Sequence, residues 1–322
     1  MSRNRLSILV AAFVSVAVLG ACSKQEPAPS TETSAPAAAP AAATPAATAP
    51  AAQSDAFAFK IGALDAFALK DGDIDVANDG KTFGVGQPTA DVAALLSAAG
   101  QPTDTMHLSI QPLLVRSEGR VLLFDTGAGE VTWARAGRLQ ASLHAAGVEA
   151  AQVTDIFLSH HHGDHVGGLL THEGALAFPN AAVHLSAAEW DAMKAEKDVA
   201  ALVAAITPKV APFQPGEAIV PGVVTAVAAE GHTPGHSAYE IASGNERLLY
   251  IGDSAHHFVV SVQRPDWVVQ YDEDSPKAVA NRRAVLKRAA DSGERVYAVH
   301  FPFPGIGHVK AQGDGFVWVP EN

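Results

Sequence analysis

Four histidines fall within six residues of this chain, and no other feature limits its fold and chemistry as strongly. They directly follow the apolar run Ile156 to Leu158 and are His160, His161, His162 and His165. In an extended segment, residues i and i+2 point to the same side, so His160 and His162 can bind one ion. Asp164 and His165 follow where a turn can direct them to a second ion. The segment predicts a metal site at the end of a strand.

Three further polar residues occupy comparable positions at long distances in the sequence. His232 lies in a Gly- and Pro-containing turn, Asp253 follows the apolar Tyr250-Ile251, and His300 follows Val299. Together with the first motif they supply five imidazoles and two carboxylates. This set matches two metal ions that share a bridging carboxylate. A set of nitrogen and oxygen ligands without thiolate favours zinc, although manganese, iron or cobalt would also fit.

The pattern His-x-His-x-Asp-His, followed by separated His, Asp and His, resembles the signature of the metallo-β-lactamase superfamily. The resemblance covers nearly the whole chain after the N-terminal low-complexity segment, and it implies an α/β fold of four layers, αββα. It implies one ion on His160, His162 and His232, a second on Asp164, His165 and His300, and Asp253 as the bridge between them.

The same resemblance implies residues that support the ligands from behind. Asp125 follows the apolar strand 121–124 and is expected to hydrogen-bond a ligand imidazole. His236 and His308 are expected near the centre but not on a metal. The ending from His300 to His308 is similar to that of the methyl parathion hydrolase group, the arylesterase and lactonase branch. Members of that group are exported di-zinc hydrolases of aryl esters, lactones or phosphotriesters.

Two cations that share a water lower its pKa towards neutrality, so no Ser or Cys nucleophile is needed. The resemblance therefore implies a binuclear hydrolase whose metal-bridging hydroxide cleaves an apolar small-molecule ester, lactone or phosphotriester. Asp164 or Asp253 is expected to orient that hydroxide or move its proton. Aromatic and histidine side chains near the ligands are expected to wall the substrate pocket: Phe301, Phe303, His257, Phe258 and Trp190.

The set of candidate ligands also bears on four alternative functions. A β-lactamase suits the fold, but those branches usually carry Cys or Ser in the region of the bridging Asp253. A sulfur dioxygenase of the same fold uses one iron and fewer ligands than this chain supplies, and a thioesterase is a further alternative. A non-catalytic envelope binding protein would be expected to have lost ligands, and none is lost here.

The charge balance argues against nucleic acid as a partner. The 22 Lys and Arg against 34 Asp and Glu give a formal charge of −12, which leaves no basic surface for a phosphate backbone. Cys22 is the single cysteine, so neither an intrachain disulfide nor a cysteine ligand is expected. The sequence leaves the oligomeric state open, and a homodimer is one of the states it allows.

The first 55 residues predict export and anchoring. Arg3 and Arg5 precede the apolar run Leu6 to Leu19, and Leu19-Gly20-Ala21-Cys22 has the pattern of a lipobox. Residues 1–22 are therefore expected to be a lipoprotein signal peptide, with Cys22 as the lipidated residue that binds the membrane. Residues 23–55, rich in Ala and Pro, are expected to be a disordered tether. The predicted location is the cell envelope, on the periplasmic side of the outer membrane.

Residues 56–322 are predicted to form the hydrolase domain, in which short β-rich runs alternate with helical ones. Strands are expected at 108–115, 121–125, 155–159, 182–185, 237–241, 247–252 and 295–299. Helices are expected at 90–99, 138–146, 187–195 and 276–290. Apolar strands that end at polar clusters, with helices between them, indicate layered sheets covered by helices.

Overall fold

The central strands of this chain carry apolar residues on both faces, which requires packing layers on both sides of each sheet. In the computed structural model, which describes residues 55–321, β7 (Arg120–Phe124) shows this most clearly. Its Leu122 and Phe124 point into one apolar core, whereas Leu123 points into another. Successive strand residues face opposite sides, so both sides are covered.

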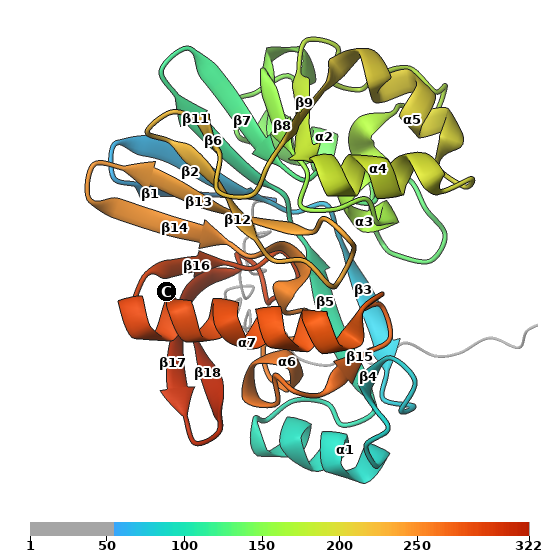
Figure 1. Cartoon of the computed structure of the whole chain (residues 1–322), viewed down its shortest axis with the longest axis vertical. Helices are drawn as coiled ribbons and strands as arrows, with labels where there is room; N and C mark the ends of the chain where they lie inside the picture. The colour runs from blue at the N-terminus through green and yellow to red at the C-terminus, as the bar shows by residue number, and fades with distance from the viewer. Residues whose placement is uncertain (1–54, 322) are drawn as a thin grey trace, which may run out of the picture. The chain divides into compact units, whose positions relative to one another are not determined.

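Two seven-stranded sheets form the two middle layers (Figure 1). The first sheet has the order β1-β2-β6-β7-β8-β9-β10, antiparallel as far as β7 and parallel beyond it. Besides β7, its strands are β1 (Ala56–Ile61), β2 (Leu64–Leu69), β6 (Leu113–Ser117), β8 (Asp155–Phe157), β9 (Ala182–Ser186) and β10 (Val210–Phe213).

The second sheet has the order β11-β12-β13-β14-β16-β17-β18, and within it only β14 and β16 run parallel to each other. Its strands are β11 (Ala218–Val220), β12 (Val224–Ala228), β13 (Ser237–Ser243), β14 (Glu246–Tyr250), β16 (Arg295–Tyr297), β17 (Ile306–Gln312) and β18 (Gly315–Pro320).

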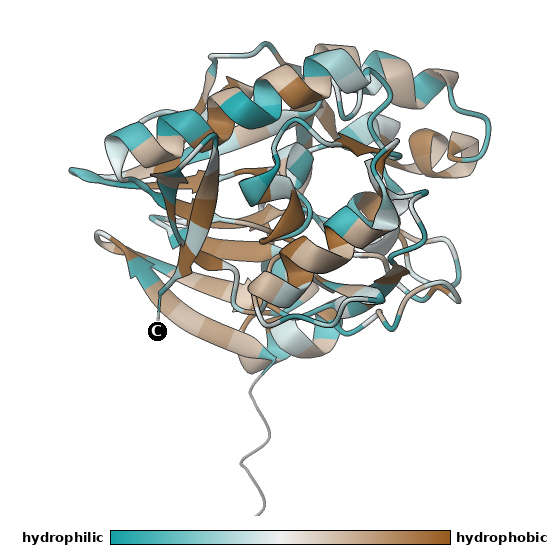
Figure 2. Ribbon diagram, turned by 90° about the horizontal axis from the view of Figure 1, so that it is seen from below, coloured by the Kyte–Doolittle hydropathy of each residue, from teal (hydrophilic) through white to brown (hydrophobic). Residues whose placement is uncertain are grey.

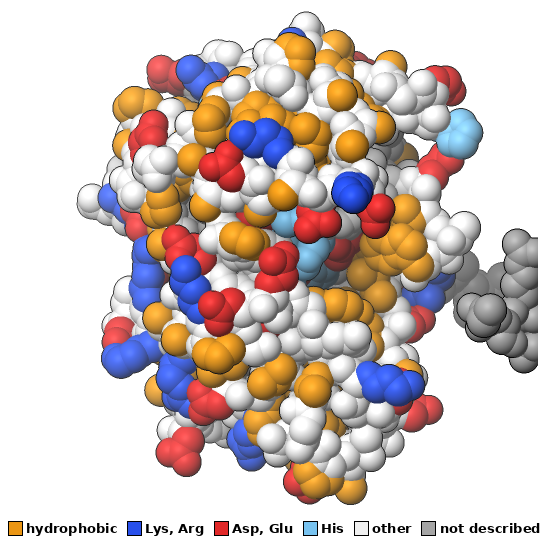
Figure 3. Space-filling model, turned by 45° about the vertical axis from the view of Figure 1, so that its right-hand side comes forward, with side chains coloured by type: hydrophobic (Ala, Val, Ile, Leu, Met, Phe, Trp, Pro, Cys, Tyr) orange, Lys and Arg blue, Asp and Glu red, His pale blue; other side chains and the backbone are white. Residues whose placement is uncertain are grey.

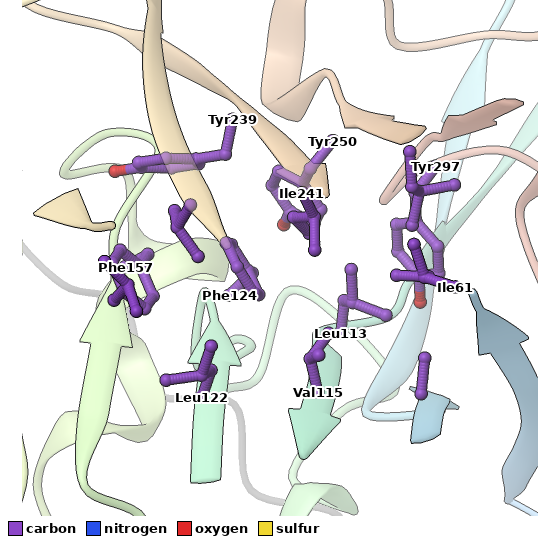
Figure 4. Close-up of a cluster of buried hydrophobic side chains, with 14 of the residues drawn as sticks. Ile61, Leu113, Val115, Leu122, Phe124, Phe157, Tyr239, Ile241, Tyr250 and Tyr297 are labelled. Atoms are coloured by element: carbon purple, nitrogen blue, oxygen red, sulfur yellow. The ribbon is translucent and has the colours of Figure 1, made fainter. Parts of the chain in front are cut away.

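The inner faces of the two sheets meet in a shared apolar core (Figure 4). Phe124 and Phe157 of the first sheet stack with ring centroids 4.9 Å apart, and Tyr239 of the second packs edge-on against both at 5.6 Å. Tyr250 and Tyr297 stack at 5.6 Å. Each buried ring contributes about 2–3 kcal/mol of hydrophobic stabilisation, so this aromatic cluster holds the sheets together.

Helices cover the outer face of each sheet. Against the first sheet lie α2 (Leu139–Ala145), α4 (Ala187–Ala195) and α5 (Ala200–Ile206). Against the second lies α7 (Ser275–Ser292), along whose ribbon hydrophilic and hydrophobic residues occur in turn (Figure 2). The side chain of Asp274 caps α7 by accepting a bond from the Lys277 amide, and Gly293 ends it with a φ of 67°. The expected αββα sandwich is confirmed.

A smaller apolar core lies beside the sandwich. A two-stranded ribbon of β3 (Gly72–Ala77) and β5 (Thr105–Ile110) packs there with α1 (Thr89–Ala98), α6 (Val260–Gln263) and the pair β4 (Phe83–Val85) and β15 (Val268–Val269). The strand predicted at 108–115 is wrong as a single element, because it is divided between β5 and β6. Pro112 cannot donate to a ladder, and the chain leaves the ribbon for the first sheet there.

The remaining short helices are α3 (Gly163–Val166) and the 3-10 turns Ala150–Gln152, Gly167–Leu169, Thr207–Lys209 and Gly252–Ser254. All described residues belong to one compact unit, and β1 is the first strand in it. Within residues 55–321, no helix combines the length and apolarity needed to cross a bilayer. The predicted signal peptide, Cys22 and the tether up to residue 54 lie outside the described residues.

Candidate metal centre

The seven predicted ligands come together where β8, β14 and β16 end. His160, His162, Asp164 and His165 follow β8 of the first sheet, the last two from the short helix α3. His232, Asp253 and His300 come from segments of the second sheet. They form two groups, in each of which the ligand atoms lie within 4.8 Å of one another: His160, His162, His232 and Asp253, and Asp164, His165 and His300. Each group therefore draws on both sheets.

The carboxylate of Asp253 lies between the two groups. Its Oδ2 is 3.3 Å from His232 Nε2 and 3.8 Å from His160 Nε2, both in the first group. Its Oδ1 is 3.3 Å from His165 Nε2 and 3.1 Å from His300 Nε2 in the second. One oxygen faces each group, which is the geometry that a bridging carboxylate requires.

The residues of this centre fit divalent cations. Three buried atoms of the seven predicted ligands have no hydrogen-bond partner among the described residues: His160 Nε2, His165 Nε2 and Asp253 Oδ1. Such atoms are costly unless an ion binds them. Burial holds the pKa of His160 well below its usual value, and burial with His232 nearby lowers the pKa of His162 to about 3. Neutral imidazoles with carboxylates and no sulfur are ligands that suit zinc.

The carboxylates of the centre also attract positive charge. Burial opposes a charge on His232, yet Asp253 and Asp272 raise its pKa to about 9. Burial likewise opposes a charge on His165, but Asp253 and Asp164 raise its pKa well above the usual value. Two divalent cations would supply the positive charge that these carboxylates otherwise draw from protons.

Asp125 supports the centre from the end of β7. Its Oδ2 is 2.7 Å from His165 Nδ1 and accepts bonds from the hydroxyls of Ser159, at 2.7 Å, and Tyr250, at 2.6 Å. Its Oδ1 accepts the Ser159 amide at 2.7 Å. Asp125 has a φ of 58°, a backbone conformation that Asp tolerates better than most residues. This network fixes the orientation of the His165 ring, as expected for this carboxylate.

His236 lies behind the bridging residue. Its Nδ1 is 2.8 Å from the carbonyl of Ala229, an acceptor, so Nδ1 carries the proton. Its Nε2 is therefore free to accept the amide of Asp253 at 2.9 Å. Through this pair of bonds His236 fixes the backbone from which the bridging carboxylate projects.

Two residues behind His232 were not predicted. Asp272 lies 3.0 Å from His232 Nδ1, and its other oxygen accepts a bond from Arg282 at 2.6 Å. Asp272 belongs to an acidic run before α7, where acidic residues are common for reasons of helix capping, so its sequence position gives no signal. The sequence does contain a signal for Arg282. It is a charged residue on the apolar stripe of α7, at helical spacing between Ala278 and Leu286.

His300 is held by the small ribbon. Its Nδ1 donates to the carbonyl of Ser109 in β5 at 2.7 Å, and the Ser109 amide bonds the His300 carbonyl at 3.1 Å. His160 Nδ1 lies 3.0 Å from the Ser159 hydroxyl. The second nitrogen of each of these imidazoles is thus engaged, which fixes the ring for metal binding.

Comparison with known proteins agrees with this geometry. The family model of the metallo-beta-lactamase superfamily matches residues 108–300, more than half of the chain. The chain belongs to this superfamily. It is similar to AidC, a dizinc quorum-quenching lactonase solved with its product N-hexanoyl-L-homoserine, at 32% identity and a TM-score of 0.78, covering 83% of this chain and 97% of AidC. It is also similar to the hydrolase AbOPH, at 30% identity and a TM-score of 0.74, covering 84% and 98%.

A curated relative is the ribonuclease Z of Salinibacter ruber (strain DSM 13855 / M31). The two are 43% identical over 79 residues, which are 24% of this chain. The chain spans about a fifth of that relative's length, since the match covers 21% of it.

In this metallo-beta-lactamase superfamily member, five of the seven predicted ligands line a cavity of about 570 Å³: His162, Asp164, His232, Asp253 and His300. Figure 3 shows histidine side chains deep in a hollow of the surface. Its other walls are largely apolar: Ile74, Val76, Leu108, Trp133 and Tyr271. Trp133 is 54% exposed and Tyr271 44% exposed. His256, also in the wall, is buried with its Nε2 3.1 Å from Asp253 Oδ2. These residues come from the ribbon and from loops.

The five side chains predicted to wall this cavity do not line it: Phe301, Phe303, His257, Phe258 and Trp190. Phe301 follows a ligand in the turn after β16, and its side chain packs in the core against Trp318 at a ring distance of 4.9 Å. Phe258 packs into the same core, and Phe303 packs at the edge of the core between the sheets. His257 Nδ1 accepts the amides of Val259 and Val260, and Trp190 packs against the first sheet's outer core.

The expectation that His308 lies behind the ligands is also wrong. His308 is on β17, where its Nδ1 is 3.1 Å from the Gly293 carbonyl and its Nε2 is 3.2 Å from Glu321. β17 pairs with β16 in antiparallel fashion, so it leads away from the end of β16 at which His300 lies. The similarity of the ending from His300 to His308 to that of a known group therefore did not predict that His308 lies near the ligands.

Proposed function

We propose that this chain is a binuclear zinc hydrolase that cleaves lactones, aryl esters or phosphotriesters. The observation that carries the proposal is the position of Asp253, whose two oxygens face two separate groups of buried ligands. Support comes from AidC, a dizinc lactonase that is 32% identical over 83% of this chain. That likeness makes the lactone the first substrate class to examine.

Zinc in these two groups would lower the pKa of a shared water and polarise the substrate's carbonyl or phosphoryl oxygen. The chain's own residues would hold and orient the reacting groups. Asp253 would hold the two groups of ligands next to each other, because one of its oxygens faces each group. Asp164 lines the cavity with 16% of its side chain exposed, so it is the residue we assign to accept a proton from the reacting water.

The walls of the cavity favour an apolar substrate. Trp133, Tyr271 and Leu108 would bury an alkyl or aryl group, at about 25 cal/mol for each Å² removed from water. Within residues 55–321, no Lys or Arg lines this cavity. A β-lactam carboxylate or an RNA backbone would therefore lack a cationic partner there.

A substrate panel tests this proposal. We expect kcat/KM for N-hexanoyl-homoserine lactone, dihydrocoumarin, phenyl acetate or methyl paraoxon to exceed that for a cephalosporin by about 100-fold. The reason is that an unpaired buried charge forfeits about 3 kcal/mol of binding. All assays use the same zinc loading, and a chelator should abolish every activity. Preference for the cephalosporin, or turnover that resists chelation, would refute the proposal.

We also propose that the protein is exported and anchored to the membrane through a lipid on Cys22. The support is the lipobox pattern at Leu19 to Cys22. In Cys22→Ala the acylated thiol is missing, so the protein should leave the membrane fraction while its specific activity stays unchanged. Fractionation of cells that express either form, followed by immunoblotting, measures this. Continued membrane association of the variant would indicate an uncleaved anchor instead.

A further inference from the structure

Glu189 is a fully buried carboxylate in the first turn of α4 that is not among the metal ligands. Its Oε1 accepts the backbone amide of His161 at 2.8 Å and is paired with the Nδ1 of the same residue. Its Oε2 accepts the hydroxyl of Thr233 at 2.7 Å and the amide of Gly235 at 2.9 Å. A single carboxylate thus makes four polar contacts, and all are with segments that carry ligands.

The residues that Glu189 contacts at His161 and Thr233 are direct chain neighbours of one group of ligands. His161 lies between His160 and His162, and Thr233 follows His232, so Glu189 joins the two segments that carry all three imidazoles of the first group. The second group has different supports. His165 is held by Asp125, and His300 is held by the Ser109 carbonyl.

The fit between α4 and the turn after His232 is close. A Cβ added to Gly235 would lie 2.2 Å from the Glu189 nitrogen and 2.3 Å from Ser186 Oγ. Ser186 caps α4 by accepting the Glu189 amide at 3.0 Å, and its hydroxyl donates to the Gly235 carbonyl at 2.7 Å. The first turn of α4 therefore rests directly on the turn that presents His232, and a change there is transmitted to the ligand.

The chemistry of these contacts calls for a carboxylate. A carboxylate only accepts hydrogen bonds, and here it meets two backbone amides, an imidazole and a hydroxyl. A glutamine of the same shape would direct its NH₂ group either at the donors of His161 or at those of Thr233 and Gly235, and two donors would then face each other. One of the two segments would then lose its anchor.

We propose that Glu189 is a positioning residue that sets the metal affinity of the group His160, His162 and His232 without touching the ion. The affinity of the group Asp164, His165 and His300 does not depend on it. The proposal concerns metal binding alone, so its test measures zinc and its outcome is independent of which substrate the enzyme hydrolyses.

The test compares Glu189→Gln with a matched control, Asp155→Asn, in the full chain. Asp155 is also buried and also accepts several bonds, from Arg120, Thr154 and His184, but it lies at the start of β8, away from the ligands. Competition with a zinc chelator gives the two affinities. We expect one to weaken by about 10- to 100-fold in Glu189→Gln and the other to stay within about twofold. The control should retain both.

Double variants assign the weakened site. In His232→Ala the first group is already broken, so adding Glu189→Gln should change zinc binding no further. In His300→Ala the first group is the one that remains, so adding Glu189→Gln should weaken the remaining zinc by the same 10- to 100-fold. If Glu189→Gln does not fold, Thr233→Val removes one of the four contacts and should produce a smaller loss of the same selectivity. Equal weakening of both sites, or none beyond that of Asp155→Asn, overturns the proposal.

Discussion

Asp253→Ala should remove tightly bound zinc from both sites and lower kcat/KM for the best substrate by at least about 1,000-fold. Its two oxygens face His232 and His160 on one side and His165 and His300 on the other, so one substitution takes a ligand from each group. Metal activation of the substrate and the nucleophile contributes several kcal/mol, and each 1.36 kcal/mol is a factor of ten in rate.

His300→Ala is the comparison, because His300 belongs to the second group only. Metal analysis after dialysis should give close to two zinc ions per chain for the wild type, close to one for His300→Ala and close to none for Asp253→Ala. Circular dichroism checks that each variant is folded. If the two variants lose similar small amounts of zinc, Asp253 does not act as a bridge.

Arg282→Ala should have the largest effect on stability, a loss of about 3–5 kcal/mol in the free energy of unfolding, as expected for removing one partner of a buried ion pair. The Arg282 side chain is 1% exposed and pairs with Asp272, which is itself fully buried. Arg282 also donates to the carbonyls of Ser254, Pro265 and Trp267. The substitution leaves these acceptors and a carboxylate without their donor in a place that water does not reach.

The neighbouring Arg283→Ala is the matched control. Arg283 is 40% exposed and pairs with Asp266, which is 60% exposed, so its loss should cost less than about 1 kcal/mol. Calorimetry should show a fall in Tm of about 10 °C for Arg282→Ala and of a few degrees at most for the control. Similar shifts for both would mean that water or a rearranged side chain replaces the buried pair.

The clustering of the seven candidate ligands could be predicted because metal binding restricts residue type and spacing so severely. His160, His162 and Asp253 have few other reasons to stand at the ends of apolar strands, whereas a wall of the cavity needs only some apolar side chain. The aromatic residues nearest to the ligands in sequence, such as Phe301, pack in the core instead. Trp133 and Leu108, which do line it, come from a loop and a ribbon whose packing the local sequence does not determine.

The layers of the sandwich were predictable for a similar reason, since continuous apolar runs in strands such as β7 indicate burial on both faces. Supporting residues were less predictable. Asp125 follows a strand directly, so its role could be anticipated. Glu189, in contrast, lies in the first turn of α4, and Asp272 lies in the loop before α7. Their partners are distant in sequence, and only the packing of α4 and α7 brings them together.

The origin of each group of ligands in both sheets has a mechanical consequence. If two ions bind as proposed, they would cross-link the segment after β8 to the later part of the chain, which contributes His232, Asp253 and His300. Sliding one sheet over the other would then have to break bonds to both ions. Metal binding would then stabilise the packing of the two sheets against each other, and the free zinc concentration around the protein would determine by how much.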